Sequence, residues 1–113
     1  YGGLAHNGRI GDFPLLARDI LDLACEERSA GPDAVLWGDP TRFGFGFMLN
    51  QEARRFGFGP SESAFGHPGM GGSLAFGDPE AQIGFGYVMN LLRGELLIDE
   101  RSSRLIDAVY ESL

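Results

Sequence analysis

The chain has 113 residues, enough for one domain, and 43% of them are hydrophobic, which suits a globular protein. Its formal net charge is −7, and all nine basic residues are arginine. This acidic balance argues against a nucleic-acid or anionic-membrane surface, because both need clustered positive charge. No apolar run approaches the roughly 18 residues of a membrane-spanning helix, and the single cysteine leaves the cellular compartment open.

The N-terminal third of the chain predicts an amphipathic helix. The opening stretch YGGLAHNG is typical of the end of a helix followed by its glycine stop. Asp12 can cap a second helix whose first turn tolerates Pro14, and residues 29–33 (SAGPD) end it, because glycine and proline do not continue a helix. Its apolar positions recur at helical spacing: Leu16, Ile20, Leu23 and Ala24. We therefore expect Cys25 to be a buried, unreactive thiol.

The period changes to two at residue 42, which predicts a strand over 42–50. Its large apolar residues alternate with glycine, methionine or asparagine: Phe43, Phe45, Phe47 and Leu49. Residues 72–77 and 82–90 predict a hairpin, because Pro79 between them suits the second position of a turn.

The last element predicted is a helix that Asp99 can cap. Its apolar stripe contains Leu105, Ile106, Val109, Tyr110 and Leu113. The order helix, three antiparallel strands, helix predicts an α+β fold with this helix packed on one face of the sheet.

Residues 65–73, FGHPGMGGS, are rich in glycine but do not match the common phosphate-binding loops. A Walker loop needs a lysine directly after its second glycine, and Gly72 stands at that position. The dinucleotide fingerprint also fails, since Leu74 replaces its third glycine and no helix follows.

The stretch from 65 to 90, FGHPGMGGSLAFGDPEAQIGFGYVMN, resembles the C-terminal part of the serine β-lactamase-like hydrolases, close to the class C β-lactamases and family VIII esterases. That superfamily carries K-T-G, often H-x-G in esterase-like members, on a strand at the active-site edge, and His67, Pro68 and Gly69 match the H-x-G form. The resemblance implies a penicillin-binding-protein-like α+β fold, an antiparallel sheet with flanking helices. It implies that 1–113 is a C-terminal fragment of one such domain.

Two catalytic motifs of the superfamily are missing from this sequence. The nucleophile motif S-x-x-K is impossible without lysine, and none of the three tyrosines begins Y-x-N. Either the N-terminal part of the protein lies outside this chain, or the protein is a degenerate relative. We expect the first, and therefore expect the chain alone to be no complete catalyst.

The resemblance implies hydrolysis of a small-molecule ester or amide through a serine acyl-enzyme, without a cofactor. The backbone N–H of Met70 matches the family's oxyanion donor, and Gly69 would let a substrate carbonyl approach the strand. His67 would point into the cleft where the family has lysine, as a hydrogen-bonding or titratable group in place of a permanent cation. A substrate carboxylate should therefore be held less well than by lysine.

Other interpretations stay open. The chain could be a non-catalytic binding or interaction module that retains this sheet, or a stand-alone domain without hydrolase ancestry. We expect Ser73 to be a strand residue, His6 to be structural, and Trp37 to rim the cleft or to pack in the core. Two histidines and one cysteine, widely separated, match no metal-ligand spacing. Because a truncated sheet exposes apolar surface and a strand edge, we also expect self-association.

Overall fold

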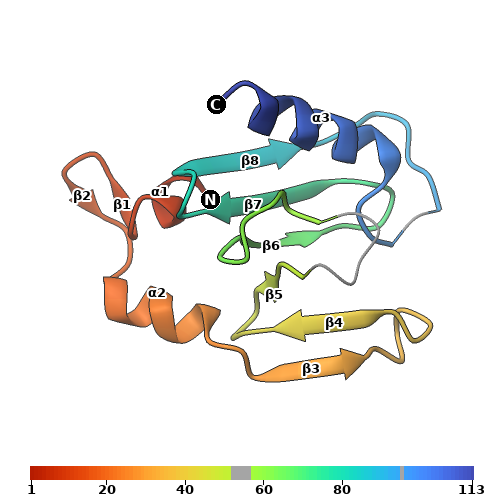
Figure 1. Cartoon of the computed structure of the whole chain (residues 1–113), viewed down its shortest axis with the longest axis horizontal. Coiled ribbons are helices and arrows are strands. Elements are labelled where there is room, and N and C mark those ends of the chain that lie inside the picture. The colour runs from red at the N-terminus through yellow and green to blue at the C-terminus, as the bar shows by residue number, and fades with distance from the viewer. Residues whose placement is uncertain (52–56, 95) are drawn as a thin grey trace.

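The computed structural model describes residues 1–51, 57–94 and 96–113 (Figure 1). In this part of the chain the elements are α1 (Gly2–Ala5), β1 (Arg9–Ile10), β2 (Phe13–Pro14), α2 (Arg18–Cys25), β3 (Ser29–Pro32), β4 (Pro40–Phe43), β5 (Met48–Leu49), β6 (Phe65–Pro68), β7 (Leu74–Asp78), β8 (Ile83–Tyr87) and α3 (Glu100–Glu111). Strands β3 to β8 form one antiparallel sheet in sequence order, and β1 pairs with β2 in a small separate hairpin. The predicted α+β class is confirmed.

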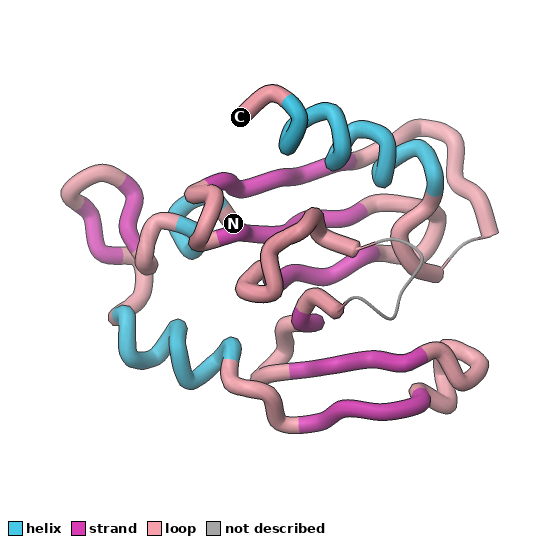
Figure 2. Tube along the Cα trace, viewed as in Figure 1, coloured by secondary structure: helices cyan, strands magenta, loops and turns pink. Residues whose placement is uncertain are grey.

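The sheet has an apolar cluster on each face. Leu74 and Phe76 of β7 point toward α3, because alternate residues of a strand share a face. They belong to a core made of Met48, Phe58, Ala64, Leu74, Phe76, Ile98 and Ile106. Phe65 of β6 points to the opposite face and packs with Leu21 and Leu49. Figure 2 shows α3 along β8 at one end of the sheet and α2 toward the other end, near β3.

The bounds predicted for the helix in the N-terminal third were wrong. Phe13 and Pro14 lie in β2, opposite β1, so that Asp12 belongs to a hairpin turn and does not cap a helix. Helix α2 begins after Ala17 and ends at Cys25. Residues 29–32, expected to terminate the helix, form strand β3 instead. Proline is tolerated there because β3 is an edge strand. The short helix α1 before the Asn7–Gly8 turn agrees with the prediction for the start of the chain.

The single strand predicted over 42–50 is two strands with a tight turn between them. The N–H of Gly44 donates to the carbonyl of Phe47 over 2.9 Å, which reverses the chain between β4 and β5. The alternating residues therefore do not share one face: Phe45 is 61% exposed, whereas Leu49 is buried. Strand β6 lies between β5 and β7, so the segments 42–50 and 72–77 are not adjacent in the sheet, in contrast to the predicted order of three consecutive antiparallel strands.

The predictions for the C-terminal third agree best with the structure. Strands β7 and β8 form the predicted hairpin, although β8 ends at Tyr87. Asp99 caps α3, and its side chain accepts from the N–H groups of Arg101 and Ser102. The buried stripe of α3 differs from the expected one. Ile106 is 2% exposed, but Leu105 and Leu113 face outward, and Ser102 takes a buried position one turn before Ile106.

Candidate active site

Strand β6 leaves one edge open at its C-terminal end. On one side, β6 pairs with β7 along its whole length, from Phe65 to Pro68. On the other side, β5 pairs only with Phe65 and Gly66. Within the part of the chain that the structure describes, no strand pairs with β6 on this side beyond Gly66. The H-x-G residues therefore lie where a substrate could run alongside a strand edge.

The turn after β6 is tightly hydrogen-bonded. The Gly69 N–H donates to the Ser73 carbonyl over 2.6 Å, and the Gly72 N–H donates to the Gly69 carbonyl over 3.1 Å. Gly71 and Gly72 have φ angles of +89° and +107°, in a backbone region that residues other than glycine rarely adopt. The glycines of FGHPGMGGS thus build a compact turn that joins β6 to β7.

Met70 stands at the tip of this turn, with its side chain 75% exposed. Its N–H donates no hydrogen bond to any residue within the described ranges, so it is not used by the sheet or by the turn. A backbone N–H that is held in place but left unpaired is what an oxyanion site requires.

His67 projects from the face of the sheet opposite α3, because it shares the parity of Phe65 on β6. The His67 ring is exposed, with its centroid 6.0 Å from that of Phe43. Its Nδ1 lies 2.6 Å from the Pro68 carbonyl oxygen, which can only accept. The hydrogen of this contact is therefore on Nδ1, and a neutral ring with its hydrogen there has Nε2 as a hydrogen-bond acceptor.

Gly69 has a neighbour that the sequence did not indicate. A Cβ at this position would overlap Ser73 Oγ across the turn. A side chain at Gly69 would therefore force the Ser73 hydroxyl to move, whether or not a substrate approaches there. Ser73 closes the turn through its carbonyl and lies directly before β7, so it belongs to the turn and not, as predicted, to the strand.

Two residues at the start of α3, the cap Asp99 and Arg101, reach the turn and were not recognised from the sequence as part of the candidate site. Arg101 donates to the carbonyl of Gly71 from Nη2 over 3.1 Å and to the carbonyl of Leu91 from Nη1 over 2.7 Å. Asp99 accepts from Nε of Arg101 over 2.9 Å. The sequence predicted Asp99 only as the cap of the C-terminal helix. Nothing in the residues around Arg101 indicates a contact with a turn 30 residues earlier in the chain.

The remaining sequence candidates lie elsewhere. His6 donates from Nδ1 to the Gly2 carbonyl at the end of α1. Trp37, in the turn between β3 and β4, is 82% exposed with a φ of +54°, so it does not pack in the core.

Among the described residues, no group of three or more His, Cys, Asp or Glu side chains could hold a metal ion. None of the described helices is long and apolar enough to cross a bilayer.

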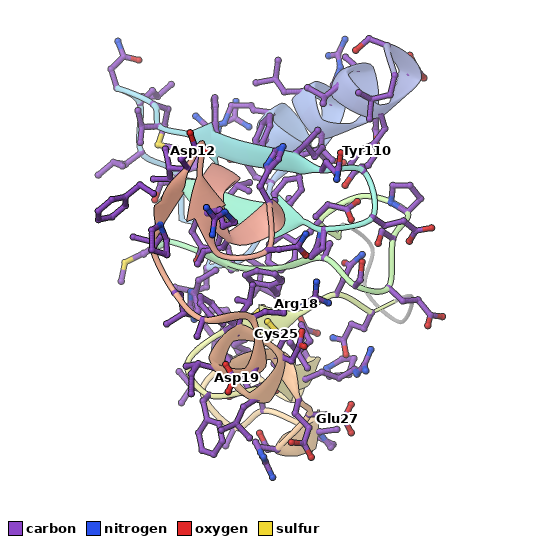
Figure 3. All side chains as sticks on the ribbon, turned by 90° about the vertical axis from the view of Figure 1, so that its left-hand side faces the viewer. Asp12, Arg18, Asp19, Cys25, Glu27 and Tyr110 are labelled. Carbon is purple, nitrogen blue, oxygen red and sulfur yellow. The ribbon has the colours of Figure 1, made fainter. Side chains whose placement is uncertain are left out.

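A cavity of about 290 Å³ lies between α2 and the beginning of β6, away from the H-x-G turn. Arg18 and Cys25, at the two ends of α2, both line this cavity, and Tyr110 lies well away from both (Figure 3). Burial and the nearby Asp22 carboxylate raise the pKa of Cys25 to about 11. The thiol is half-buried and almost fully protonated at neutral pH, which makes it a poor nucleophile.

Comparison with known proteins identifies the class to which this fold and this strand edge belong. The family model described as Beta-lactamase matches residues 5–108, and the chain therefore belongs to the beta-lactamase family. Among curated proteins, it is 30% identical over 103 residues to the Esterase/beta-lactamase LipL of Mycobacterium tuberculosis (strain ATCC 25618 / H37Rv), a match that covers 90% of this chain.

Solved structures agree with this membership. The chain superposes on a family VIII carboxylesterase with a TM-score of 0.89 and 35% identity over 100% of its length. It superposes on a penicillin-binding protein homologue from Caulobacter crescentus with a TM-score of 0.92 and 43% identity over 99% of its length. The chain spans only 22% of the Mycobacterium protein, 30% of the carboxylesterase and 29% of the penicillin-binding protein homologue.

Proposed function

We propose that this chain is the C-terminal portion of a serine hydrolase that cleaves a small-molecule ester or amide through an acyl-enzyme. The observation that carries the proposal is the open edge of β6, where the H-x-G residues end in a turn whose Met70 N–H is unpaired within the described ranges. The names of the relatives, an esterase/beta-lactamase and a family VIII carboxylesterase, support the same reaction class.

In the proposed reaction a serine outside residues 1–113 attacks the substrate carbonyl, and the carbonyl oxygen becomes an oxyanion. The Met70 N–H is one donor to this oxyanion. Collapse of the tetrahedral intermediate breaks the ester bond, and the alcohol leaves with the proton taken from the serine. Water then attacks the acyl-enzyme, and the acid is released as the serine regains its proton.

His67 would contact the part of the substrate that lies on the β6 edge. Its exposed ring offers Nε2 as an acceptor and carries no permanent charge. An ester with a neutral acyl group does not need a cation at this position, whereas a β-lactam carboxylate is held better by lysine. The proposal therefore favours an ester substrate over a β-lactam.

The test compares the complete protein with residues 1–113 alone. We expect the complete protein to hydrolyse a chromogenic short-chain ester and to be labelled by a fluorophosphonate at a serine outside 1–113. The chain alone should show no turnover above a heat-treated control, because it lacks a nucleophile with its base. Labelling of Ser73, or turnover by the chain that Ser73→Ala abolishes, would contradict the proposal. A complete protein that folds but shows neither turnover nor labelling would favour a non-catalytic binding module.

A further inference from the structure

The guanidinium of Arg101 is connected to the Met70 N–H through two peptide groups of the glycine turn. Nη2 of Arg101 donates to the carbonyl of Gly71, and the same carbonyl accepts from the N–H of Arg93 over 3.3 Å. The other end of that peptide group, the Gly72 N–H, donates to the Gly69 carbonyl. The Gly69 carbonyl in turn shares its peptide group with the Met70 N–H.

This arrangement sets the direction of the Met70 N–H. All peptide bonds of the described chain are trans, so the C=O and N–H of each peptide group point in opposite directions. Because the Gly69 carbonyl points into the turn toward Gly72, the Met70 N–H must point out of it. Rotation of the Gly69–Met70 peptide group would break the bond from Gly72, and rotation of the Gly71–Gly72 peptide group would break the bond from Arg101.

The same chain of hydrogen bonds polarises the Met70 N–H. A donor that carries a full positive charge makes a stronger hydrogen bond than a neutral one. Hydrogen bonds in series strengthen each other, since each polarised carbonyl makes the N–H of its own peptide group a better donor. The charge of Arg101 therefore raises the donor strength of the Gly72 N–H and, through the Gly69 carbonyl, that of the Met70 N–H.

Arg101 is itself held in one position. Asp99, 3% exposed, accepts from Nε and Nη2 of Arg101 while it caps α3. The Gly72 backbone lies directly against this pair, because a Cβ there would stand 2.5 Å from Asp99 Oδ2 and 2.7 Å from Arg101 Nη2. With Leu91 as a further acceptor, the guanidinium has little freedom to move away from the turn.

We propose that Arg101 is a positioning residue for acyl transfer, which orients and polarises the Met70 N–H as an oxyanion donor through the Gly71–Gly72 and Gly69–Met70 peptide groups. The proposal rests on the function proposed above and adds to it a residue on α3 that contacts no substrate. Its effect should appear in the transition state, where the oxyanion carries its charge, and not in ground-state binding.

The catalytic test uses Arg101→Gln in the complete protein, with Arg104→Gln as the matched control. Arg104 lies on the same helix, is exposed, and makes no hydrogen bond or ion pair with the residues that the structure describes. We expect Arg101→Gln to lower kcat for a chromogenic ester about 10- to 100-fold, because a displaced oxyanion donor has effects of this size. The KM should change less than about twofold, and Arg104→Gln should retain the parental kcat and KM.

A transition-state analogue separates this role from a purely structural one. A boronic acid that forms a charged tetrahedral adduct with the serine should lose affinity in Arg101→Gln by about the factor by which kcat falls. Arg101→Lys should recover part of both losses, because lysine retains the charge but not the planar fork. If Arg101→Gln does not fold, Arg101→Lys carries the test. A parental kcat and a parental boronate affinity in Arg101→Lys would overturn the proposal. An increase in KM without a decrease in kcat would also overturn it.

An NMR experiment on the complete protein reports on the connection without catalysis. Arg101→Gln should move the amide proton of Met70 upfield, toward a weaker donor, and Arg104→Gln should leave it unchanged. An unmoved Met70 amide in a folded Arg101→Gln variant overturns the proposed connection. An inactive parent in which this amide still moves would contradict the hydrolase function and support the connection.

Discussion

Gly69 and Ser73 meet across the turn after β6, and their contact changes what a mutation at Gly69 reports. A side chain at 69 would overlap Ser73 Oγ before it met any substrate. A simple Gly69→Val variant would therefore combine damage to the turn with any effect on the substrate. Ser73→Ala removes the Oγ and leaves the carbonyl oxygen and the Cβ of residue 73, which a Cβ at 69 would meet at ordinary distances of 3.6 Å and 3.7 Å.

In a Ser73→Ala background of the complete protein, Gly69→Ala should keep the parental melting temperature and still slow acylation. The new methyl group would lie beside residue 73, on the face of the sheet from which His67 projects, where the proposal places the substrate. We expect the acylation rate to fall at least about tenfold, which corresponds to about 1.4 kcal/mol. The rate is measured as the pre-steady-state burst with a chromogenic ester, with Ser73→Ala alone as the control. Equal bursts in the two variants would show that no substrate lies against Gly69.

At the scale of elements, Asp99 connects the start of α3 with the glycine turn. Burial acts to raise its pKa, but the hydrogen bonds from the Arg101 side chain and from the Ser102 and Arg101 N–H groups outweigh it, so that the pKa is lowered. A carboxyl group with a lowered pKa in the folded state stabilises the fold above its unfolded pKa of about 3.9. This stabilisation is lost as the pH falls through the folded value.

Asp99→Ala should therefore destabilise the protein at pH 7 by about 0.5–2 kcal/mol for the lost cap. The difference from the parent should shrink as the pH falls below about 3.9, because the carboxyl is then protonated in the unfolded parent and, at still lower pH, in the folded parent. Urea unfolding at pH 7 and at pH 3 measures both effects. Glu100→Ala is the control, since Glu100 is exposed in the same first turn. A constant difference between Asp99→Ala and the parent at the two pH values would contradict the assignment.

A second connection between elements joins α3 to the β7–β8 turn. The hydroxyl of Tyr110 donates to Oδ2 of Asp78 over 2.6 Å, and Asp78 is fully buried. Oδ1 of Asp78 accepts from the N–H groups of Glu80 and Ala81 and holds the turn. Burial, followed by the bond to Asp78, raises the pKa of Tyr110, so this hydroxyl remains a donor at physiological pH.

Tyr110→Phe should lower the free energy of unfolding by about 1–3 kcal/mol, because it leaves a buried carboxylate oxygen without its donor. Tyr87→Phe is the matched control, since Tyr87 is half-buried against the same core. The hydroxyl of Tyr87 has no partner among the residues that the structure describes. Denaturant midpoints of the two variants give the comparison. Equal midpoints would mean that the Tyr110–Asp78 bond adds nothing to the stability of the fold.

At the scale of the whole molecule, β8 is an edge strand and the surface carries many large apolar side chains. Those exposed by 60% or more are Ile10, Phe13, Val35, Trp37, Phe45, Met70, Val88, Leu91, Leu92 and Leu113. Val88, 84% exposed, follows directly after β8. An unpaired edge with an apolar neighbour is a template for pairing with a second copy.

Residues 1–113 expressed alone should therefore self-associate, and Val88→Lys should reduce this association more than Val35→Lys. Lysine next to an edge strand opposes edge-to-edge pairing, whereas Val35 lies in the β3–β4 turn with a similar exposure of 79%. Sedimentation velocity over a range of concentrations measures the effect. A chain that remains monomeric at high concentration and unfolds in one cooperative transition would contradict this expectation.

The features that the sequence determined by itself are those set by neighbouring residues. The Asp99 cap, the β7–β8 hairpin around Pro79 and the α1 stop at Asn7–Gly8 each depend on backbone groups within a few residues. The H-x-G strand was recognised from a continuous run of residues in the same way, and the family match over 5–108 agrees with it. The alternation of large apolar residues over 42–50 led to the wrong prediction of a single strand. Alternation does not show where a chain that contains Gly44 and Gly46 reverses its direction.

Only the tertiary structure decided which distant residues support the candidate site. Arg101 reaches Gly71 across 30 positions of sequence, and its guanidinium has carbonyl partners only after α3 has packed on the sheet. The overlap that a side chain at position 69 would have with Ser73 Oγ depends in the same way on how closely the two residues approach across the turn. Such contacts depend on how the whole buried face of α3 packs on the sheet, because all neighbours of a helix together determine its rotation about its axis. In this structure Ile106 and Ser102 are buried and Leu105 faces outward.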